Sequence, residues 1–358
     1  MPGTDNQPTF SIVIFILLLF ASFSPNKIKI NFLNSFGFYL ALILIITLGF
    51  SIVYNFLDEY KLPFLPRLFG FLQFIIAFIF GTTTFFTLHK RWLQIILWIY
   101  AIFTFIYYLT GGLIEEFLIR SRVEGVSEFL ADSGRGARTL SPEPSILALH
   151  ILNIILLNFL IHKKSKLTWE LLLLALIPLL GSLSGYGFFI AVTLILIFYP
   201  KLFFSISSLF LVILTPIFLY MQDSEIRVLL ILRGFKENGI AFFLQDESFF
   251  SRFNSFLEYK NSFIHTFPFG DAFTIFGGGG IISLISALGL IGLLFFIVIF
   301  IFLLFSNYSM SIKVLFFAWL LVYFISGSFG VPLFGLILGV FITNSFKYEK
   351  SIYITSSL

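Results

Sequence analysis

The sequence contains no cysteine and few charged residues. Because there is no thiol, the chain can form neither disulfide bonds nor thiolate metal sites, and it has no cysteine nucleophile. Charged residues make up only 11% of the 358 residues, against roughly 25% in soluble domains. This shortage of charge excludes a soluble globular fold.

Hydrophobic residues make up 59% of the chain and aromatic residues 20%. They form unbroken apolar runs near the length, roughly 20 residues, that a helix needs to cross the hydrocarbon core of a bilayer. The strands of a membrane barrel would alternate in polarity, and these runs do not. The sequence therefore predicts an all-α polytopic integral membrane protein, with residues 1–358 forming a single membrane domain.

Eleven apolar segments are predicted to span the membrane. They lie at residues 9–24, 36–57, 69–88, 92–111, 145–161, 167–182, 186–199, 203–221, 281–306, 311–327 and 329–345. The two segments beside Gly181–Gly185 are short, and if they formed one helix, every later segment would cross in the opposite direction. The first segment lacks a preceding basic stretch and a cleavage site, so we expect a retained helix and not a signal peptide.

The distribution of lysine and arginine supports eleven spans with the N-terminus outside, since cytoplasmic loops carry the positive excess. The inner face then carries eleven of the 22 basic residues and only two of the 18 acidic residues. Those basic residues are Lys27, Lys29, Lys90, Arg91, Lys163, Lys164, Lys166, Lys201, Lys313, Lys347 and Lys350. We therefore expect a cytoplasmic C-terminus. The basic pI then reflects topology, and no nucleic-acid partner is expected.

Two long loops, at residues 112–144 and 222–280, fall on the outer face in this topology. Part of the first is expected to lie along the membrane surface as an amphipathic helix, because apolar and charged residues are interleaved there. In the second, Asp246-Glu247-Ser248 is typical of a helix start and is followed by apolar residues at helical spacing. We expect this segment to be helical and half buried.

Five arginines of these loops are candidates for binding an anionic substrate. They are Arg135, Arg138, Arg227, Arg233 and Arg252. A guanidinium group keeps its charge and binds phosphate through paired hydrogen bonds. The alternative is that each is a solvated charge paired with an acidic residue of the same loops. For any one arginine, composition alone favours this second interpretation. What supports the first is that all five share one membrane face with the sizeable acidic clusters.

Glu143 lies between two prolines, directly before the helix predicted from residue 145. Near a helix N-terminus a carboxylate stabilises the helix through its dipole, and it can also act as a general base. The local sequence does not decide between these roles. His265, in the second loop, is either another acid/base candidate or a surface residue. No Asp-x-Asp pair or close histidine cluster exists to hold a divalent cation, so neither a metal nor a cofactor is expected.

Ionisable groups inside the predicted spans, which normally mark ion or proton paths, are nearly absent. His150 lies in the fifth span and Glu170 near the inner end of the sixth. A lone histidine at that depth is most often a hydrogen-bonded core residue, so transport driven by intramembrane charge is disfavoured. The run Gly277–Gly280 lacks the Lys and Ser or Thr of a phosphate-binding loop.

Four short motifs occur in a particular order along the chain. They are GRGARTLSPEPS before the fifth span, LLGSLSGYGFF at the break between the sixth and seventh, RFNSFLEYKNSFIHTFPFG in the second loop, and ALGLIGLLFF in the ninth span. In the third, Arg252, Phe256, Pro268 and Gly270 form a pattern of an arginine, an aromatic residue and a Pro-x-Gly. In these features the chain resembles the Wzy-type O-antigen polymerases and their relatives, the O-antigen ligases. The resemblance covers roughly the C-terminal two thirds of the chain.

The resemblance favours a polymerase. Ligases typically carry a His-Asn pair just before the glycine-spaced helix, where this chain has its four-glycine run. His265 lies earlier and does not correspond to that histidine. A ligase, which would transfer finished glycan from its lipid diphosphate to an acceptor, stays an alternative. A flippase for lipid-linked oligosaccharide would need polar groups within its spans and usually repeat symmetry, and the sequence shows little of the first and none of the second.

The resemblance implies a GT-C-like fold and a metal-independent glycosyltransferase that acts at the outer face of the bacterial inner membrane. Its substrates would be undecaprenyl-diphosphate-linked oligosaccharide repeats, and the growing glycan would move from its lipid diphosphate to a new repeat. The five arginines would stabilise charge on the diphosphate. Glu143 is the first candidate for the general base, with His265 and Asp271 as further candidates. The family also implies a flippase and a chain-length regulator as partners.

Overall fold

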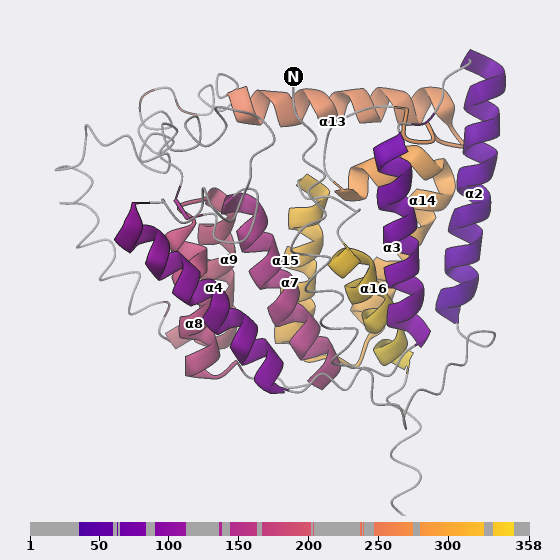
Figure 1. Cartoon of the computed structure of the whole chain (residues 1–358). Helices are drawn as coiled ribbons and strands as arrows, with labels where there is room; N and C mark the ends of the chain where they lie inside the picture. The colour runs from indigo at the N-terminus through magenta and orange to yellow at the C-terminus, as the bar shows by residue number, and fades with distance from the viewer. Residues whose placement is uncertain are drawn as a thin grey trace, which may run out of the picture. The chain divides into compact units, whose positions relative to one another are not determined.

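The structure is a computed structural model in which every regular element of the described residues is a helix (Figure 1). The described residues are 36–59, 63, 65–83, 90–111, 136–137, 144–162, 167–201, 203, 237, 239, 247–274, 280–325 and 332–346. The helices are α2 (Phe36–Glu59), α3 (Leu65–Thr83), α4 (Lys90–Thr110), α7 (Pro144–His162), α8 (Trp169–Gly181), α9 (Gly185–Phe198), α13 (Glu247–Thr266), α14 (Gly280–Phe305), α15 (Met310–Ile325) and α16 (Pro332–Phe346).

Apart from α13, which lies in the second long loop, each of these helices overlaps a predicted span. The predicted break between the sixth and seventh spans is confirmed, because α8 ends at Gly181 and α9 begins at Gly185. The helix predicted to start at Asp246-Glu247-Ser248 is also confirmed, since α13 begins at Glu247. The predicted spans at 9–24 and 203–221 lie outside the described residues.

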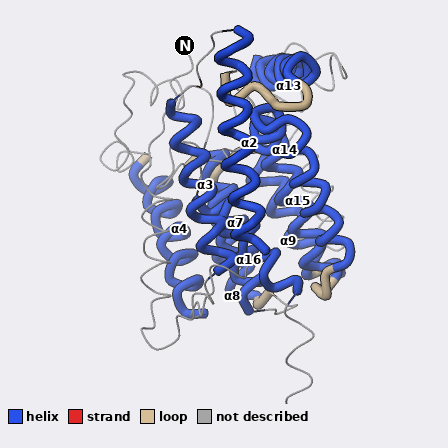
Figure 2. Tube along the Cα trace, turned by 90° about the vertical axis from the view of Figure 1, so that its right-hand side faces the viewer, coloured by secondary structure: helices blue, strands red, loops and turns tan. Residues whose placement is uncertain are grey.

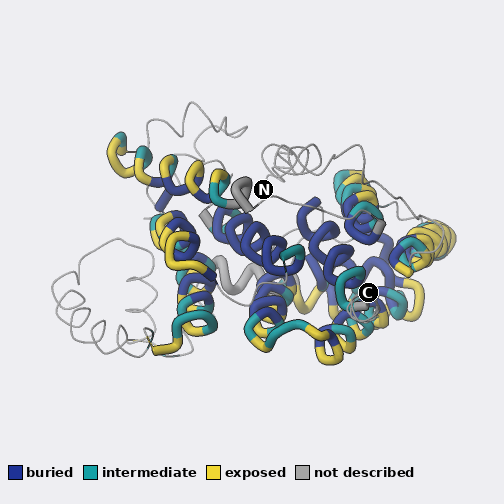
Figure 3. The backbone as a smooth tube through the Cα atoms, turned by 90° about the horizontal axis from the view of Figure 1, so that it is seen from below, coloured by how far each residue is buried: buried dark blue, intermediate teal, exposed yellow. Residues whose placement is uncertain are grey.

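The helices have the length and surface of a membrane protein. Four are long and apolar enough to cross a bilayer: Phe36–Asp58, Leu65–Thr82, Ser145–His162 and Gly280–Phe305. Large apolar side chains such as Phe50, which is 62% exposed, lie on their surfaces, and Figure 3 shows many exposed positions along the helices. Water would disfavour so much exposed apolar surface, whereas lipid chains would accept it. The chain is therefore a helical membrane protein.

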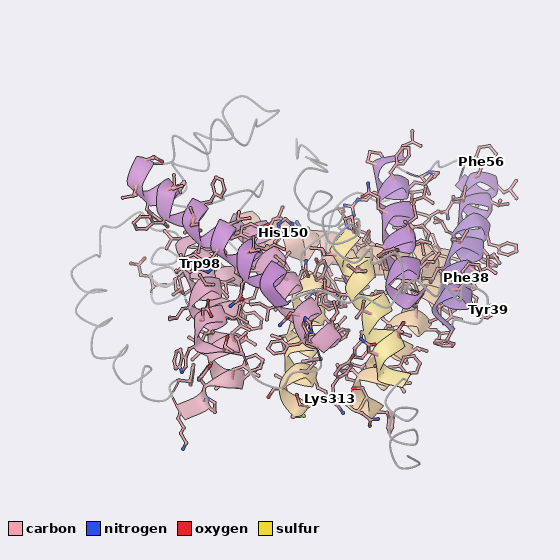
Figure 4. All side chains as sticks on the ribbon, turned by 60° about the horizontal axis from the view of Figure 1, so that its bottom comes forward. Phe38, Tyr39, Phe56, Trp98, His150 and Lys313 are labelled. Atoms are coloured by element: carbon pink, nitrogen blue, oxygen red, sulfur yellow. The ribbon has the colours of Figure 1, made fainter. Side chains whose placement is uncertain are left out.

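Aromatic side chains lie at both ends of α2. Phe38 and Tyr39 project outward near its first residues, and Phe56 projects outward near its last (Figure 4). Tyr39 is 52% exposed and Phe56 is 45% exposed. Aromatic side chains with a polar tip are enriched where a membrane protein meets the two bilayer surfaces. The placement of Tyr39 agrees with such a surface at the start of α2.

Two basic residues mark the two ends of α14. Near its start, the guanidinium group of Arg67 donates a hydrogen bond to Ser283 Oγ at 3.3 Å. Near its end, Lys313 Nζ donates to the carbonyl oxygen of Leu304 at 2.8 Å. Between these contacts α14 is interrupted at Gly289. Its transmembrane position is supported by its 26-residue length and its apolar composition.

By its contacts the chain divides into two compact units. The first contains α4, α8, α9 and the part of α7 up to Ile155. The second contains α2, α3, α14, α15 and α16, together with the end of α7 and α13 from Phe250 onward. Each unit contains one helical region that is interrupted.

In the first unit, α4 packs against α8, and α8 packs against α9. The hydroxyl group of Tyr108, on α4, donates to the carbonyl oxygen of Gly181 at 2.6 Å, where α8 ends. His150, on α7, is buried, and its Nδ1 lies 3.4 Å from the hydroxyl oxygen of Tyr100 (Figure 4). The expectation that His150 is a hydrogen-bonded core residue is confirmed.

In the second unit, α3 and α16 approach until their backbones touch. A Cβ atom on Gly335 would lie 2.4 Å from the carbonyl oxygen of Phe74, and one on Gly339 would lie 2.4 Å from that of Phe78. On α3, Gly81 faces the backbone of α16 in the same way. Membrane helices associate through such small residues because lipid provides no hydrophobic drive between helices. The glycines therefore set the distance between α3 and α16.

Helix α13 runs crosswise to α2, α3 and α14 and lies near the end of α2 and the start of α14 (Figures 1 and 2). Helix α2 packs alongside both α3 and α14. A turn at residues 267–273 follows α13 and precedes α14. We call this segment the docked turn, because it packs into an interruption of α14.

Replacing Gly339 with alanine is expected to lower the free energy of unfolding by about 1–3 kcal/mol, because the added methyl group overpacks the contact between α3 and α16. The matched control is G49A on α2, where an added Cβ would meet nothing within 4 Å. Its helix propensity should make it neutral or slightly stabilising. Unfolding of the purified protein in detergent measures both, and equal effects would contradict the proposed backbone contact.

Candidate functional site

In the first unit, residues 136–137, which belong to the predicted first outer loop, bind to the end of α8. The backbone N–H of Ala137 donates to the carbonyl oxygen of Gly181 at 2.9 Å, and that of Gly136 donates to Ser182 at 3.3 Å. A Cβ atom on Gly136 would lie 2.3 Å from the carbonyl oxygen of Gly181. This position therefore requires glycine. The motif GRGARTLSPEPS and the motif LLGSLSGYGFF meet at this point.

The carbonyl groups at the end of α8 need partners because the helix stops there. Leu183 has a positive φ of 45°, which ends the helical conformation. Ser184 then starts α9, and its hydroxyl oxygen accepts a hydrogen bond from the N–H of Gly187 at 3.0 Å. The outer loop and Tyr108 supply the donors that the interrupted helix lacks.

In the second unit, the docked turn binds to an interruption of α14 at Gly289, where φ is 57° and ψ is −134°. The N–H of Asp271 donates to the carbonyl oxygen of Ser286 at 2.9 Å, and that of Ala272 donates to Ala287 at 3.2 Å. In return, the N–H of Leu290 donates to the carbonyl oxygen of Pro268 at 2.9 Å. The turn therefore satisfies backbone groups that the interruption leaves without helical partners.

Two glycines make this close backbone contact possible. Gly270 has φ of 90°, and a Cβ atom there would lie 2.4 Å from the carbonyl oxygen of Ala287. A Cβ atom on Gly289 would lie 2.2 Å from the carbonyl oxygen of Pro268. The Pro-x-Gly of the third motif and the glycine-spaced helix of the fourth thus pack against each other.

Helix α2 holds the docked turn from the other side. The hydroxyl group of Ser51 donates a short hydrogen bond to the carbonyl oxygen of Phe269. Asn55 Nδ2 donates to the carbonyl oxygen of Gly270 at 2.8 Å. The rings of Tyr54 and Phe269 lie with their centroids 5.1 Å apart. The turn is therefore fixed by backbone and side-chain contacts on two helices.

Asp271 is the buried carboxylate at the centre of this arrangement, with 1% of its surface exposed. Its Oδ2 accepts hydrogen bonds from Ser286 at 2.6 Å and Ser262 at 2.9 Å, and its Oδ1 accepts one from the N–H of Phe273 at 2.9 Å. Burial raises the pKa of Asp271, although these hydrogen bonds and the charge of Arg67 oppose the shift.

The two residues after Asp271 have an unusual backbone conformation. Ala272 and Phe273 have φ of 52° and 64°, in the left-handed region that residues with a side chain rarely occupy. Each such residue costs of the order of 1–3 kcal/mol, which the surrounding contacts must offset. Strain of this kind is concentrated at functional sites. The docked turn is therefore a candidate for a functional role as well as a structural one.

Arg67 is a charged residue near Asp271 that the sequence patterns did not single out. It lies in the first turn of α3 and contacts Ser283, whose hydroxyl group also interacts with Tyr259. Tyr259, on α13, is 2% exposed, and burial raises the pKa of its hydroxyl group while Arg67 opposes the shift. In the sequence, the only feature that could have indicated Arg67 is its position directly after a proline at the start of a span.

The predicted site residues fall in different places. His265 is exposed on α13, whereas Asp271 is buried. Arg252 lies in α13, but its side chain is outside the described part of the structure. Glu143, Arg135, Arg138, Arg227 and Arg233 are also outside the described residues. Among the described residues, no group of three or more His, Asp or Glu side chains is arranged to hold a metal ion.

Replacing Asp271 with asparagine is expected to flatten the pH dependence of stability. Because the folded state raises the pKa of Asp271, the stability tied to this group is fully present below the ordinary pKa of about 4 and is lost as pH rises toward the folded value. D271N carries no such titration and keeps a polar side chain at the same place.

Unfolding in detergent between about pH 4 and pH 8 measures this difference. The control is D58N, since Asp58 is exposed at the end of α2. D271L should lower the free energy of unfolding by about 1–3 kcal/mol or more at every pH, because it leaves three buried donors without an acceptor. Parallel pH profiles for the wild-type protein and D271N would contradict the assigned role of the carboxylate.

Comparisons of this chain with protein families, with curated proteins and with solved structures found no match. The functional hypothesis therefore rests on the four sequence motifs and on the contacts between them.

Proposed function

We propose that this protein is a membrane glycosyltransferase of the O-antigen polymerase type. Its substrates would be undecaprenyl-diphosphate-linked oligosaccharide repeats, which it would join at the outer face of the bacterial inner membrane. It would adopt a GT-C-like arrangement of about eleven spans, with the N-terminus outside and the C-terminus in the cytoplasm. A flippase would deliver the repeats, and a chain-length regulator would act with the polymerase.

The observation that supports this proposal is the pairing of the four motifs. The first motif binds the second through Gly136 and Ala137, and the third binds the fourth through the docked turn. In both pairs, N–H groups of an outer loop donate to carbonyl groups freed where a helix is interrupted. Motifs chosen from the sequence for their resemblance thus turn out to be contact partners.

The proposed chemistry uses the arginines as the source of positive charge. The bond between the first sugar of the growing glycan and the lipid diphosphate breaks, and a new glycosidic bond forms to a hydroxyl group of the incoming repeat. The diphosphate leaves with additional negative charge, which Arg135, Arg138 and Arg252 would stabilise, with Arg227 and Arg233 as further candidates. The proton of the attacking hydroxyl group passes to a general base.

Glu143 stays the first candidate for this base, and His265 is the second. His265 is exposed on α13 and so is open to a substrate. Asp271 is a weaker candidate, because three donors already occupy its carboxylate oxygens and its side chain is buried. Its contacts suit a residue that positions α13 and the docked turn over the end of the unit.

A second candidate function is transport of the lipid-linked oligosaccharide. The interruption of α14 at Gly289 beside a buried acidic residue resembles the discontinuous helices of secondary transporters. The chain has few other ionisable groups in its spans, which favours the transferase. A ligase would use the same outer loops as a polymerase and would differ in its acceptor.

One reconstitution separates the three functions. Purified protein in lipid vesicles is given undecaprenyl-diphosphate-linked repeats, and the products are resolved on a gel. A ladder of longer lipid-linked glycans supports the polymerase. Glycan transferred only to an added lipid A acceptor would identify a ligase. Movement of the repeat across the vesicle membrane without a new glycosidic bond would identify a transporter.

In this assay, R135A, R252A and E143Q are each expected to reduce chain elongation by about 100-fold or more, the usual effect of losing a group that stabilises transition-state charge. K260A is the matched control for R252A, because Lys260 is an exposed basic residue of the same helix. It should keep the ladder. Long chains made by all three variants, each inserted normally in the membrane, would refute the assigned roles.

A further inference from the structure

Helix α13 has three different sides. Tyr259 faces the interior of the second unit, to which this part of α13 belongs, and is 2% exposed. Asn261 and His265, one turn apart, are exposed and polar. On a third side, Phe256 and Ile264 are exposed by 40% and 59%, and they lie two turns apart on the same stripe. A helix in water needs only a buried side and a polar side, so the exposed apolar side requires an explanation.

The apolar side continues into the docked turn. The rings of Phe263 and Phe267 lie 5.8 Å apart, which connects the end of α13 to the turn. Phe267 is 51% exposed and Phe269 is 42% exposed. Phe269 also contacts Tyr54 of α2. The exposed apolar surface therefore runs without a gap from α13 through the turn to α2.

The depth of the docked turn follows from its contacts with α2. The turn is held by Ser51 and Asn55, which lie six and two residues before Leu57, the last apolar residue of the helix. At 1.5 Å per residue, the turn lies about 3–9 Å inside the apolar end of α2. Interfacial helices bury their apolar side about 5–10 Å into the boundary between headgroups and acyl chains.

The neighbouring surface of α2 is also apolar and exposed. Val53 and Phe56 are 55% and 45% exposed, and Leu57 is 71% exposed. These residues belong to a helix that is long and apolar enough to cross the bilayer. Exposed apolar residues of a spanning helix contact lipid, so the aromatic residues of the turn beside them are at the right depth to do the same.

We propose that α13 and the docked turn form an interfacial anchor that lies in the outer leaflet, with Phe256, Ile264, Phe267 and Phe269 in contact with lipid. Lys260, on the same stripe, extends its charged end toward the headgroups. The polar side of α13, with His265, faces water. This anchor does not depend on the reaction that the protein catalyses, and it would hold His265 at the level of lipid phosphates.

Single cysteine substitutions test this anchor, because the chain contains no cysteine of its own. I264C and F256C place a fluorescent label on the apolar side of α13, and E258C places it on the polar side, where Glu258 is exposed. F50C, within the span of α2, is the control for contact with lipid. The labelled proteins are reconstituted in lipid nanodiscs containing a nitroxide-labelled phospholipid, and iodide is then added as an aqueous quencher.

Labels at positions 264 and 256 are expected to be quenched several-fold more strongly by the nitroxide lipid than the label at 258. Iodide should give the opposite order, and position 50 should follow the lipid pattern. Using two positions on the apolar side protects the test against one variant that does not fold. If iodide quenches 264 and 256 as strongly as 258, the anchor is refuted. Protection of both from both quenchers would mean that a protein surface covers α13, and this too would overturn the proposal.

Discussion

The constraint on which the structure depends is that backbone N–H and C=O groups inside a bilayer must be paired within the protein. Unbroken helices meet it by themselves. The chain interrupts its helices in two described places, between α8 and α9 and at Gly289 of α14. In both, a segment that connects helices supplies N–H donors to the freed carbonyl groups. The interruptions therefore determine where these connecting segments bind, and the candidate site is built around those points.

The sequence predicted most of the helical framework, because apolar runs and helix-start residues are local signals. The break at Gly181–Gly185 and the start of α13 near Asp246 were predicted from short stretches alone and are confirmed. The four motifs were also visible in the sequence. Their pairing was not, since neither order nor composition indicates which loop reaches which helix interruption.

The parts that escaped prediction depend on contacts between distant segments. The interruption of α14 at Gly289 lies inside a continuous apolar run, and nothing in that run predicts it. The partners of the docked turn, Ser51 and Asn55, lie more than 200 residues earlier in the chain. The contact of Arg67 with Ser283 spans a similar separation. For the same reason the sequence indicated Asp271 only as a catalytic candidate. Its hydrogen bonds with Ser262 of α13 and Ser286 of α14 show that its carboxylate links these two helices.

The docked turn binds α14 through its backbone, whereas its side chains Phe267 and Phe269 are exposed. This difference constrains how the protein can evolve. Phe267 and Phe269 can change to other apolar residues without loss of the hydrogen bonds made by Pro268, Asp271 and Ala272. The number of residues from Pro268 to Ala272 cannot change so freely, because an insertion there would move donors away from their acceptors. Natural variants of this region should therefore differ in composition far more readily than in length.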